Sequence, residues 1–282
     1  METQVAASSS KWADLGVRLT SAAVMIPAVI ADVWVGGIWF HLFVALLAVL
    51  MANEWVNICH DQDQPQLAFH AGAAMAGALL PLNVGIGGSL IAIAVLWLLS
   101  GGLAYFRKPD GALWRYLGVP YVSLPAIALV LIRNDAAFGI QAIVWLMVTV
   151  WSADSLAYFA GRIIGGPKLA PVLSPKKTWA GLGGAMAGSA LASAVFAFVV
   201  GLSGLAFLIV IAAALAVVEQ AGDLFKSAMK RHYGVKDSGR LIPGHGGVID
   251  RVDGLVAVAS VAALIGLLRG GMNATGVGIL IW

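Results

Sequence analysis

Long runs of apolar residues, separated by short polar connections, dominate the chain. Nine such runs can be drawn, at residues 19–36, 38–58, 67–83, 85–100, 119–132, 137–159, 180–200, 204–222 and 252–269. Apolar residues are continuous within each run and do not alternate with polar ones, which favours helices over the strands of a membrane β-barrel. Several runs are shorter than the ~20 residues of a straight span, so tilted or half-buried helices are expected. The pattern predicts an all-α, polytopic membrane protein with about nine transmembrane helices.

The composition supports this class. The 282 residues are 60% hydrophobic and only 11% charged, with a mean hydropathy of +0.91, whereas soluble domains are about 45–50% apolar. No linker or soluble module interrupts the pattern. We expect one membrane domain over residues 1–282, with an N-terminal transmembrane half (1–150), catalytic motifs on helices and loops (151–254) and a last transmembrane helix at 252–269.

Lysine and arginine are unequally divided between alternate connections. Fifteen lie on one side, against Arg133 and Arg269 on the other. Positive residues favour the cytoplasmic side of a membrane. We therefore expect an odd number of spans, with the N-terminus and the catalytic loops in the cytoplasm, in a multi-pass protein of the bacterial inner membrane.

Charged residues are concentrated between Gly222 and Gly254, although the protein as a whole carries few. A helix there would place Asp223, Ser227 and Lys230 on one face. A carboxylate and an ammonium about two turns apart can bracket a metal-bound phosphate. Ionisable groups beside a bilayer are expensive to desolvate and usually persist because they handle ions or charged substrates. The segment therefore predicts phosphate chemistry at a membrane surface.

The end of the same segment adds two further features. Asp250 and Asp253 are three residues apart, so a helix that starts there aims both carboxylates in the same direction. The preceding residues 243–247, Pro-Gly-His-Gly-Gly, are too glycine-rich for a helix and predict a loop with exposed amides. Such amides can bind an anion. Three aspartates near a bilayer favour a functional role over a structural one.

A second polar segment covers residues 151–184. Asp154, Tyr158 and Gly161 fall on one helical face, where Asp154 invites a cation or a salt bridge to Lys176 or Lys177. Two lysines near a helix N-terminus make a phosphate site, with Thr178 as a possible N-cap. The glycines that follow would let the next helix pack closely on a neighbour; they are Gly181, Gly183, Gly184 and Gly188.

Other polar residues are interpreted as structural. Arginines and lysines beside the spans, such as Arg107 and Arg115, are ordinarily determinants of topology. Glu54 and Glu219 are expected to be interfacial or paired with neighbouring helices. Lone histidines such as His41 are interpreted as incidental.

Residues 222–254 closely resemble the signature of the phosphatidate cytidylyltransferase (CDP-diacylglycerol synthase) family. The matching elements are Ser227, Lys230-Arg231, Lys236-Asp237, Pro243-Gly244-His245-Gly246-Gly247 and Asp250-Arg251-Val252-Asp253. The upstream WxxDxxAYxxG and SPKKT elements, at Trp151–Gly161 and Ser174–Thr178, also look like the family's. The chain departs from many members at Lys226 and Ala180, where they carry glutamate.

The resemblance implies transfer of a cytidylyl group from CTP to phosphatidic acid, giving CDP-diacylglycerol and pyrophosphate with Mg²⁺. A second metal or a monovalent ion is a further possibility. The metal is assigned to Asp223 and Asp250, with Asp253 as a ligand or its support and Asp154 as another candidate. Lys230 joins the three signature aspartates as a catalytic residue. The substrate-binding residues are predicted to be Ser174, Lys176, Lys177, Ser227, Arg231, Lys236, Asp237, His245 and Arg251.

Partners and alternatives follow from the same features. CTP, phosphatidic acid and the lipid bilayer are expected, a homodimer is suggested by the family, and no nucleic acid is expected. Two alternatives stay open: a lipid kinase that uses CTP as donor, and a transporter of a phosphorylated solute. Transporters commonly show internal repeats and broken helices at mid-membrane, neither of which is clear in this chain.

Overall fold

The structure is a computed structural model that describes residues 23–107, 112–241 and 246–282. It is mostly helical, and each of the nine predicted apolar runs corresponds to one helix. After a first short helix at Ala23–Val35, the elements are α2 (Gly37–Cys59), α3 (Gln64–Leu79), α4 (Pro81–Arg107), α5 (Ala112–Arg133), α6 (Gly139–Ile163), β1 (Lys168–Ala170), β2 (Ser174–Thr178), α7 (Trp179–Val200), α8 (Leu205–His232), α9 (Ile249–Gly270) and α10 (Thr275–Leu280).

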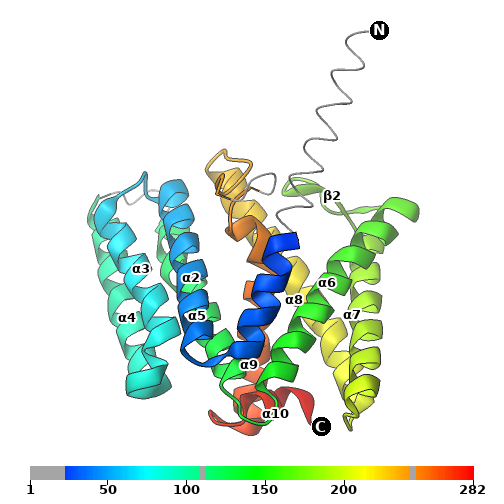
Figure 1. The fold of residues 1–282 in the computed structure, drawn as a ribbon. Coiled ribbons are helices and arrows are strands. Elements are labelled where there is room, and N and C mark those ends of the chain that lie inside the picture. Colours follow the sequence, from blue (N-terminus) through cyan, green and yellow to red (C-terminus); the bar gives the residue numbers. More distant parts are fainter. Residues whose placement is uncertain (1–22, 108–111, 242–245) are drawn as a thin grey trace.

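Seven of the helices in the described ranges are long and apolar enough to cross a membrane. The helix Ala23–Val35 and the 16-residue α3 are too short to be counted among these seven. The sequence had predicted that some of the apolar helices would be short. The prediction of a polytopic helical membrane protein is confirmed. Figure 1 shows the helices running up and down side by side, with the β1–β2 hairpin at one end and α10 at the other.

The structure differs from the sequence pattern at two helix boundaries and in one additional helix. The apolar run at 204–222 stops ten residues before the end of helix α8, which continues to His232 and so includes the charged helix expected after Gly222. Helix α4 begins at Pro81 and contains a kink at Gly85, where φ is 70°. The short helix α10 was not predicted, since six residues are too few to give a hydropathy signal.

The connection between α6 and α7 is a small antiparallel hairpin of β1 and β2. Strand β2 is the SPKKT element, which leads directly into α7. The predicted N-cap is confirmed: the Thr178 hydroxyl accepts a hydrogen bond from the Gly181 amide at 3.0 Å. Lys176 and Lys177 therefore sit on a strand fixed to the first turn of α7.

Helix α7 packs against α6 through three of the four glycines singled out above. A Cβ atom on Gly181, Gly184 or Gly188 would approach a carbonyl oxygen of α6 at 3.2, 2.6 and 2.6 Å, respectively. Close packing of these two helices therefore depends on the missing side chains. The prediction was wrong for Gly183, whose Cβ direction faces open space, because it lies on the other side of the helix.

Candidate functional site

Asp223, Asp250 and Asp253, the three aspartates predicted to be catalytic, converge on one ammonium group. Lys226, on α8, contacts Asp223 at 2.9 Å, forms a short ion pair with Asp253 and lies 3.8 Å from Asp250. Asp250 and Asp253 come from the first turns of α9, so two helices supply the cluster. Lys226 is buried, and a buried ammonium is stable only when carboxylates surround it.

Lys230 adds a second positive charge to the same cluster, one turn beyond Lys226. Its Nζ lies 2.6 Å from Oδ1 of Asp250. The other oxygen of Asp250 accepts from the backbone amide of Ser238 at 2.8 Å and faces the Ser238 hydroxyl at 3.1 Å. Asp250 is thus held in one orientation from two sides.

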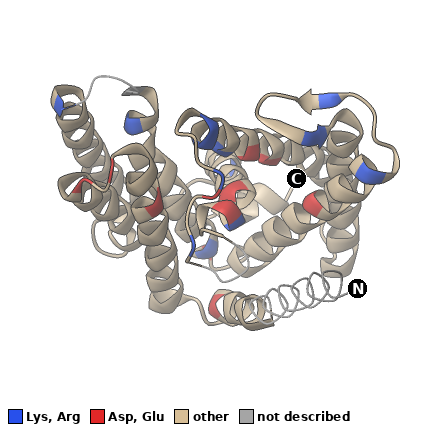
Figure 2. Cartoon of the chain, turned by 90° about the horizontal axis from the view of Figure 1, so that it is seen from above, with Lys and Arg blue, Asp and Glu red and all other residues tan. Residues whose placement is uncertain are grey.

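The two polar segments of the sequence meet at Asp223. Lys177, from the hairpin, contacts Oδ2 of Asp223 at 2.6 Å and donates to the side-chain oxygen of Gln220 at 2.7 Å. Lys177 thus pairs with Asp223 and Gln220 of α8, although a salt bridge to Asp154 had been considered. Figure 2 shows acidic and basic residues next to one another in the middle of the molecule, with further basic residues on the hairpin.

Asp154 lies instead beside another carboxyl group. Its side chain contacts that of Glu219 on α8, and Glu219 is buried with only 2% of its surface exposed. Oε2 of Glu219 has no hydrogen-bond partner among the described residues. Two facing carboxyl groups with an unpartnered oxygen need a proton or a cation between them.

A polar cavity of about 450 Å³ lies on the hairpin side of the cluster. Asp154, Tyr158 and Gly161 all line it, as their shared helical face predicted. Asp223 lines it as well. Four basic side chains belong to the same lining: Arg162, Lys168, Lys176 and Lys177. The cavity therefore combines basic side chains with the carboxylates of Asp154 and Asp223, which suits a metal-bound polyphosphate.

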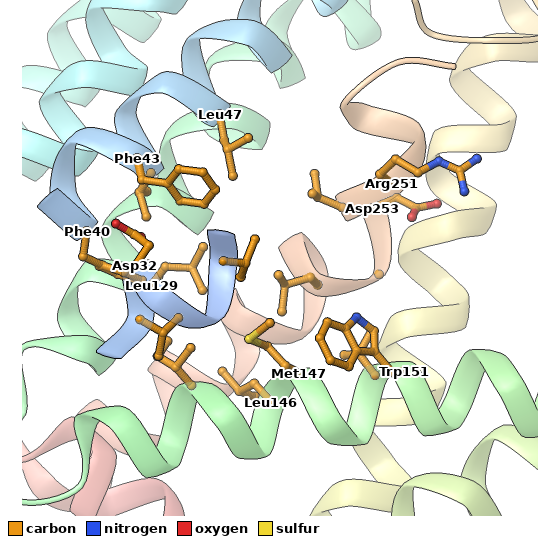
Figure 3. Close-up of a pocket in the computed structure, with 18 of the residues that line it drawn as sticks. Asp32, Phe40, Phe43, Leu47, Leu129, Leu146, Met147, Trp151, Arg251 and Asp253 are labelled. Atoms are coloured by element: carbon orange, nitrogen blue, oxygen red, sulfur yellow. The ribbon is translucent and has the colours of Figure 1, made fainter. Parts of the chain in front are cut away.

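An apolar cavity of about 190 Å³ lies on the other side, between the first helix, α2, α5, α6 and α9. Figure 3 shows aliphatic and aromatic side chains around it, with Arg251 and Asp253 on α9. Asp154 lines this cavity as well as the polar one. The two cavities therefore adjoin at the carboxylates, one suited to hydrocarbon and the other to phosphate.

Several predicted site residues lie elsewhere. Arg231, Lys236 and Asp237 are exposed, and Ser174 and Ser227 are half-buried. Within the described ranges, none of these five belongs to the lining of either cavity. His245 lies outside the described residues.

The donor chemistry fits a hard divalent cation, because carboxylate oxygens are the ligands that Mg²⁺ prefers. The unpartnered oxygen of Glu219 beside Asp154 also fits a missing positive charge. Within the described part of the chain, however, no group of three or more acidic, histidine or cysteine side chains is already arranged for a metal. The aspartates form ion pairs with lysine ammonium groups instead, and Lys226 contacts more of them than any other lysine in the described ranges.

Two residues of this region were missed by the sequence interpretation. Lys226 was noted only as a departure from the family's glutamate, although its spacing of three from Asp223 could have indicated an ion pair. Glu54 was expected to be interfacial or paired with a neighbouring helix, without a role in the site. Its carboxylate accepts hydrogen bonds from Ser238, Val248 and Ile249, which connect it to the start of α9. No local signal in the sequence of α2 points to that contact.

Comparison with known proteins adds independent information. Residues 16–268 match the model of the cytidylyltransferase family. The chain is 40% identical over 257 residues to the phosphatidate cytidylyltransferase of Brucella abortus, covering 90% of this chain and 94% of that protein. It is 33% identical over 258 residues to that of Pseudomonas aeruginosa, covering 88% and 95%. The chain belongs to the phosphatidate cytidylyltransferase family.

Proposed function

We propose that this protein transfers the cytidylyl group of CTP to phosphatidic acid, producing CDP-diacylglycerol and pyrophosphate for phospholipid biosynthesis. The observation that supports it best is the pair of adjoining cavities, one with basic side chains and one apolar, which share Asp154 and are lined by Asp223 and Asp253, respectively. A reaction between a water-soluble triphosphate and a membrane lipid needs a site where a polar cavity and an apolar cavity adjoin. Family membership and the named activity of the relatives agree with it.

The polar cavity is assigned to the triphosphate of CTP. Lys176, Lys177, Lys168 and Arg162 supply positive charge along its lining, and charge-assisted hydrogen bonds to phosphate are the strong ones. Lys177 is fixed by Asp223 and Gln220 and therefore keeps its position before the nucleotide binds.

The apolar cavity is assigned to the hydrocarbon part of phosphatidic acid next to its headgroup. Arg251 and Asp253 belong to its lining, and Arg251 is assigned to the lipid phosphate. A phosphate oxygen of the lipid attacks the α-phosphorus of CTP, forming a new P–O bond while the bond to the β-phosphate bridging oxygen breaks and pyrophosphate leaves. No protein nucleophile is needed, because the lipid phosphate is itself the nucleophile.

Mg²⁺ would be held by Asp223, Asp253 and Asp154, which line the cavities, with Asp250 completing the carboxylate set. When bound, it would supply positive charge that neutralises the triphosphate and orients nucleophile and leaving group. Until then, Lys226 pairs with Asp223 and Asp253, and Lys230 pairs with Asp250, which holds the three carboxylates in place.

Orientation in the bacterial inner membrane is also proposed. Arg133 and Arg269 lie in the last turns of α5 and α9. Both helices finish at the α10 end of the bundle, opposite the hairpin and the carboxylate cluster (Figure 1). The excess of positive charge at the hairpin end supports placing the site in the cytoplasm, where CTP is made. The homodimer stays a prediction.

Two isotopic positions in CTP separate the proposed reaction from its rivals. Purified protein, phosphatidic acid and Mg²⁺ are incubated with [α-³²P]CTP or with [γ-³²P]CTP, each with an EDTA control. Cytidylyl transfer moves only the α label into the lipid phase, and only with metal present. Transfer of the γ label would identify a CTP-dependent lipid kinase. Transfer of neither label by folded protein would redirect attention to transport.

A further inference from the structure

Glu54 is a buried carboxylate of α2 that contacts the segment leading into α9. Only 4% of its surface is exposed. Oε1 accepts from the Val248 amide at 2.7 Å, and Oε2 accepts from the Ile249 amide at 3.0 Å and from the Ser238 hydroxyl at 2.8 Å. The free amides of a helix N-terminus favour a negative charge. Glu54 therefore caps α9 from a different helix, about 190 residues away along the chain.

The same contacts lead directly to Asp250. The Ser238 hydroxyl lies between Glu54 and Asp250, and the Ser238 amide donates to Asp250 at 2.8 Å. Asp250 itself follows Ile249 in the first turn of α9. Glu54 thus fixes both the residue that hydrogen-bonds Asp250 and the helix end that carries it.

Two glycines allow this approach. A Cβ atom on Gly247 would lie 2.5 and 2.6 Å from the Glu54 oxygens, and one on Gly239 would lie 2.7 Å from Oε1. All three distances are shorter than van der Waals contact. Gly247 of the signature and Gly239 therefore make room for a carboxylate of this chain, in addition to any role toward substrate.

Helix α2 is well supported at this level. Trp55 is fully buried and its ring lies 4.7 Å from that of Tyr121 on α5 and 6.4 Å from that of Phe225 on α8. Phe225 immediately precedes Lys226. The ring contacts and the Glu54 hydrogen bonds together connect the N-terminal helices to both helices that carry the aspartates.

We propose that Glu54 is a positioning residue for the reaction: it holds Ser238 and the start of α9 so that Asp250 is oriented within the carboxylate cluster. The inference rests on the proposed function, because it assumes that Asp250 acts there. It assigns a role in the site to a helix that the signature motifs do not include.

The variant that tests this is Glu54→Gln, which keeps the size but places an NH₂ group against N–H donors. Ser238→Ala removes one of the same contacts. His41→Gln is the matched control. His41 is also buried on α2, where it hydrogen-bonds the Ala78 carbonyl and Asn134, about three and a half turns from Glu54. All are purified in detergent and compared for kcat, for KM of each substrate and for thermal stability.

We expect kcat of Glu54→Gln to fall about 10–100-fold, since a charged acceptor of several buried hydrogen bonds is lost. KM for CTP should change far less, because the polar cavity is untouched. Ser238→Ala should give a smaller fall in kcat, and His41→Gln should lower thermal stability while kcat of the folded protein stays normal. Trypsin should cleave after Arg240 faster in Glu54→Gln than in the parent protein or in His41→Gln.

Two results would overturn the proposal. One is a Glu54→Gln protein with kcat within about twofold of the parent. The other is equal loss of kcat in Glu54→Gln and His41→Gln, in step with lost thermal stability. The cleavage comparison needs no substrate, so it reports on the anchor even if the parent protein fails the labelled-CTP assay. Failure of the proposed function and failure of this inference are therefore distinguishable.

Discussion

Charged groups at the two ends of the helical bundle have different kinds of partners. At the α10 end, Asp135 accepts hydrogen bonds from the backbone amides of Ala137, Phe138 and Val277 at 2.8, 3.0 and 2.8 Å. At the hairpin end, Asp223 and Asp253 pair with lysine side chains. One carboxylate is fixed by backbone, whereas the others are held by groups that can move.

The arginines at the α10 end, like Asp135, form hydrogen bonds with backbone groups. Arg133 donates to the Val33 carbonyl at 2.7 Å. Arg269 donates to the carbonyls of Gly278 and Ile281 at 2.6 and 2.9 Å and stacks on the Trp282 ring at 3.4 Å from its centroid. Each closes a connection between helices. They contribute to stability and take no part in a cavity of the proposed site.

The difference separates structural charge from functional charge. A carboxylate whose oxygens already accept hydrogen bonds from backbone amides keeps these partners when a ligand binds elsewhere. A carboxylate paired with lysines beside a cavity can exchange them for a metal ion or position them for phosphate. The comparison can be tested by substitutions at each end.

The largest effect is expected from Asp223→Asn and Asp250→Asn. Each removes a negative charge from the cluster with little change in shape, and turnover should fall by about 10³-fold or more. Both proteins should remain monodisperse in detergent. Near-normal turnover of either variant, measured with labelled CTP, would contradict its assignment to the metal.

Lys177→Met should have the next largest effect. It removes an ammonium from the lining of the polar cavity while keeping most of the apolar stem. KM for CTP should rise about 10–100-fold, with a smaller change in KM for phosphatidic acid. An equal rise for both substrates would argue against assigning the cavity to the nucleotide.

Asp135→Asn should lower the stability of the protein and leave its turnover nearly unchanged. Loss of a charged acceptor for three amides should cost about 1–3 kcal/mol, seen as a lower thermal midpoint in detergent. Turnover of the folded protein should stay within about twofold of normal. A selective loss of turnover would show that the α10 end is coupled to the site.

The smallest effect is expected from Arg231→Ala. The side chain is exposed, and exposed charges contribute about 0–1 kcal/mol, so kcat/KM should fall less than about fivefold. A loss as large as that of Lys177→Met would restore Arg231 to the substrate-binding residues.

Much of this arrangement was predictable from local sequence. Apolar runs gave the helices, because a segment that crosses a bilayer must satisfy its backbone hydrogen bonds internally and present apolar side chains to lipid. The N-cap at Thr178 and the shared face of Asp154, Tyr158 and Gly161 followed from helix geometry alone. The motif resemblance gave the family, which the comparisons then confirmed.

Contacts between distant segments were not predictable in this way. Lys177 was assigned to phosphate or to Asp154, but it pairs with Asp223 on α8. Lys226 looked like a departure from the family's pattern, and its position among three aspartates depends on how α8 and α9 pack. The apolar run stopped ten residues before the end of α8, because hydropathy does not register the charged last turns of a helix.

The sequence by itself determined the membrane class, the apolar helices and the chemical character of the two polar segments, because hydrophobicity and helical periodicity act locally along the chain. Only the tertiary structure decided which charged groups contact one another. It joined Glu54 of α2 to the start of α9, Lys177 of the hairpin to α8, and an apolar cavity to a polar one. Those contacts depend on helix packing, and no residue carries a local signal for a partner 190 positions away.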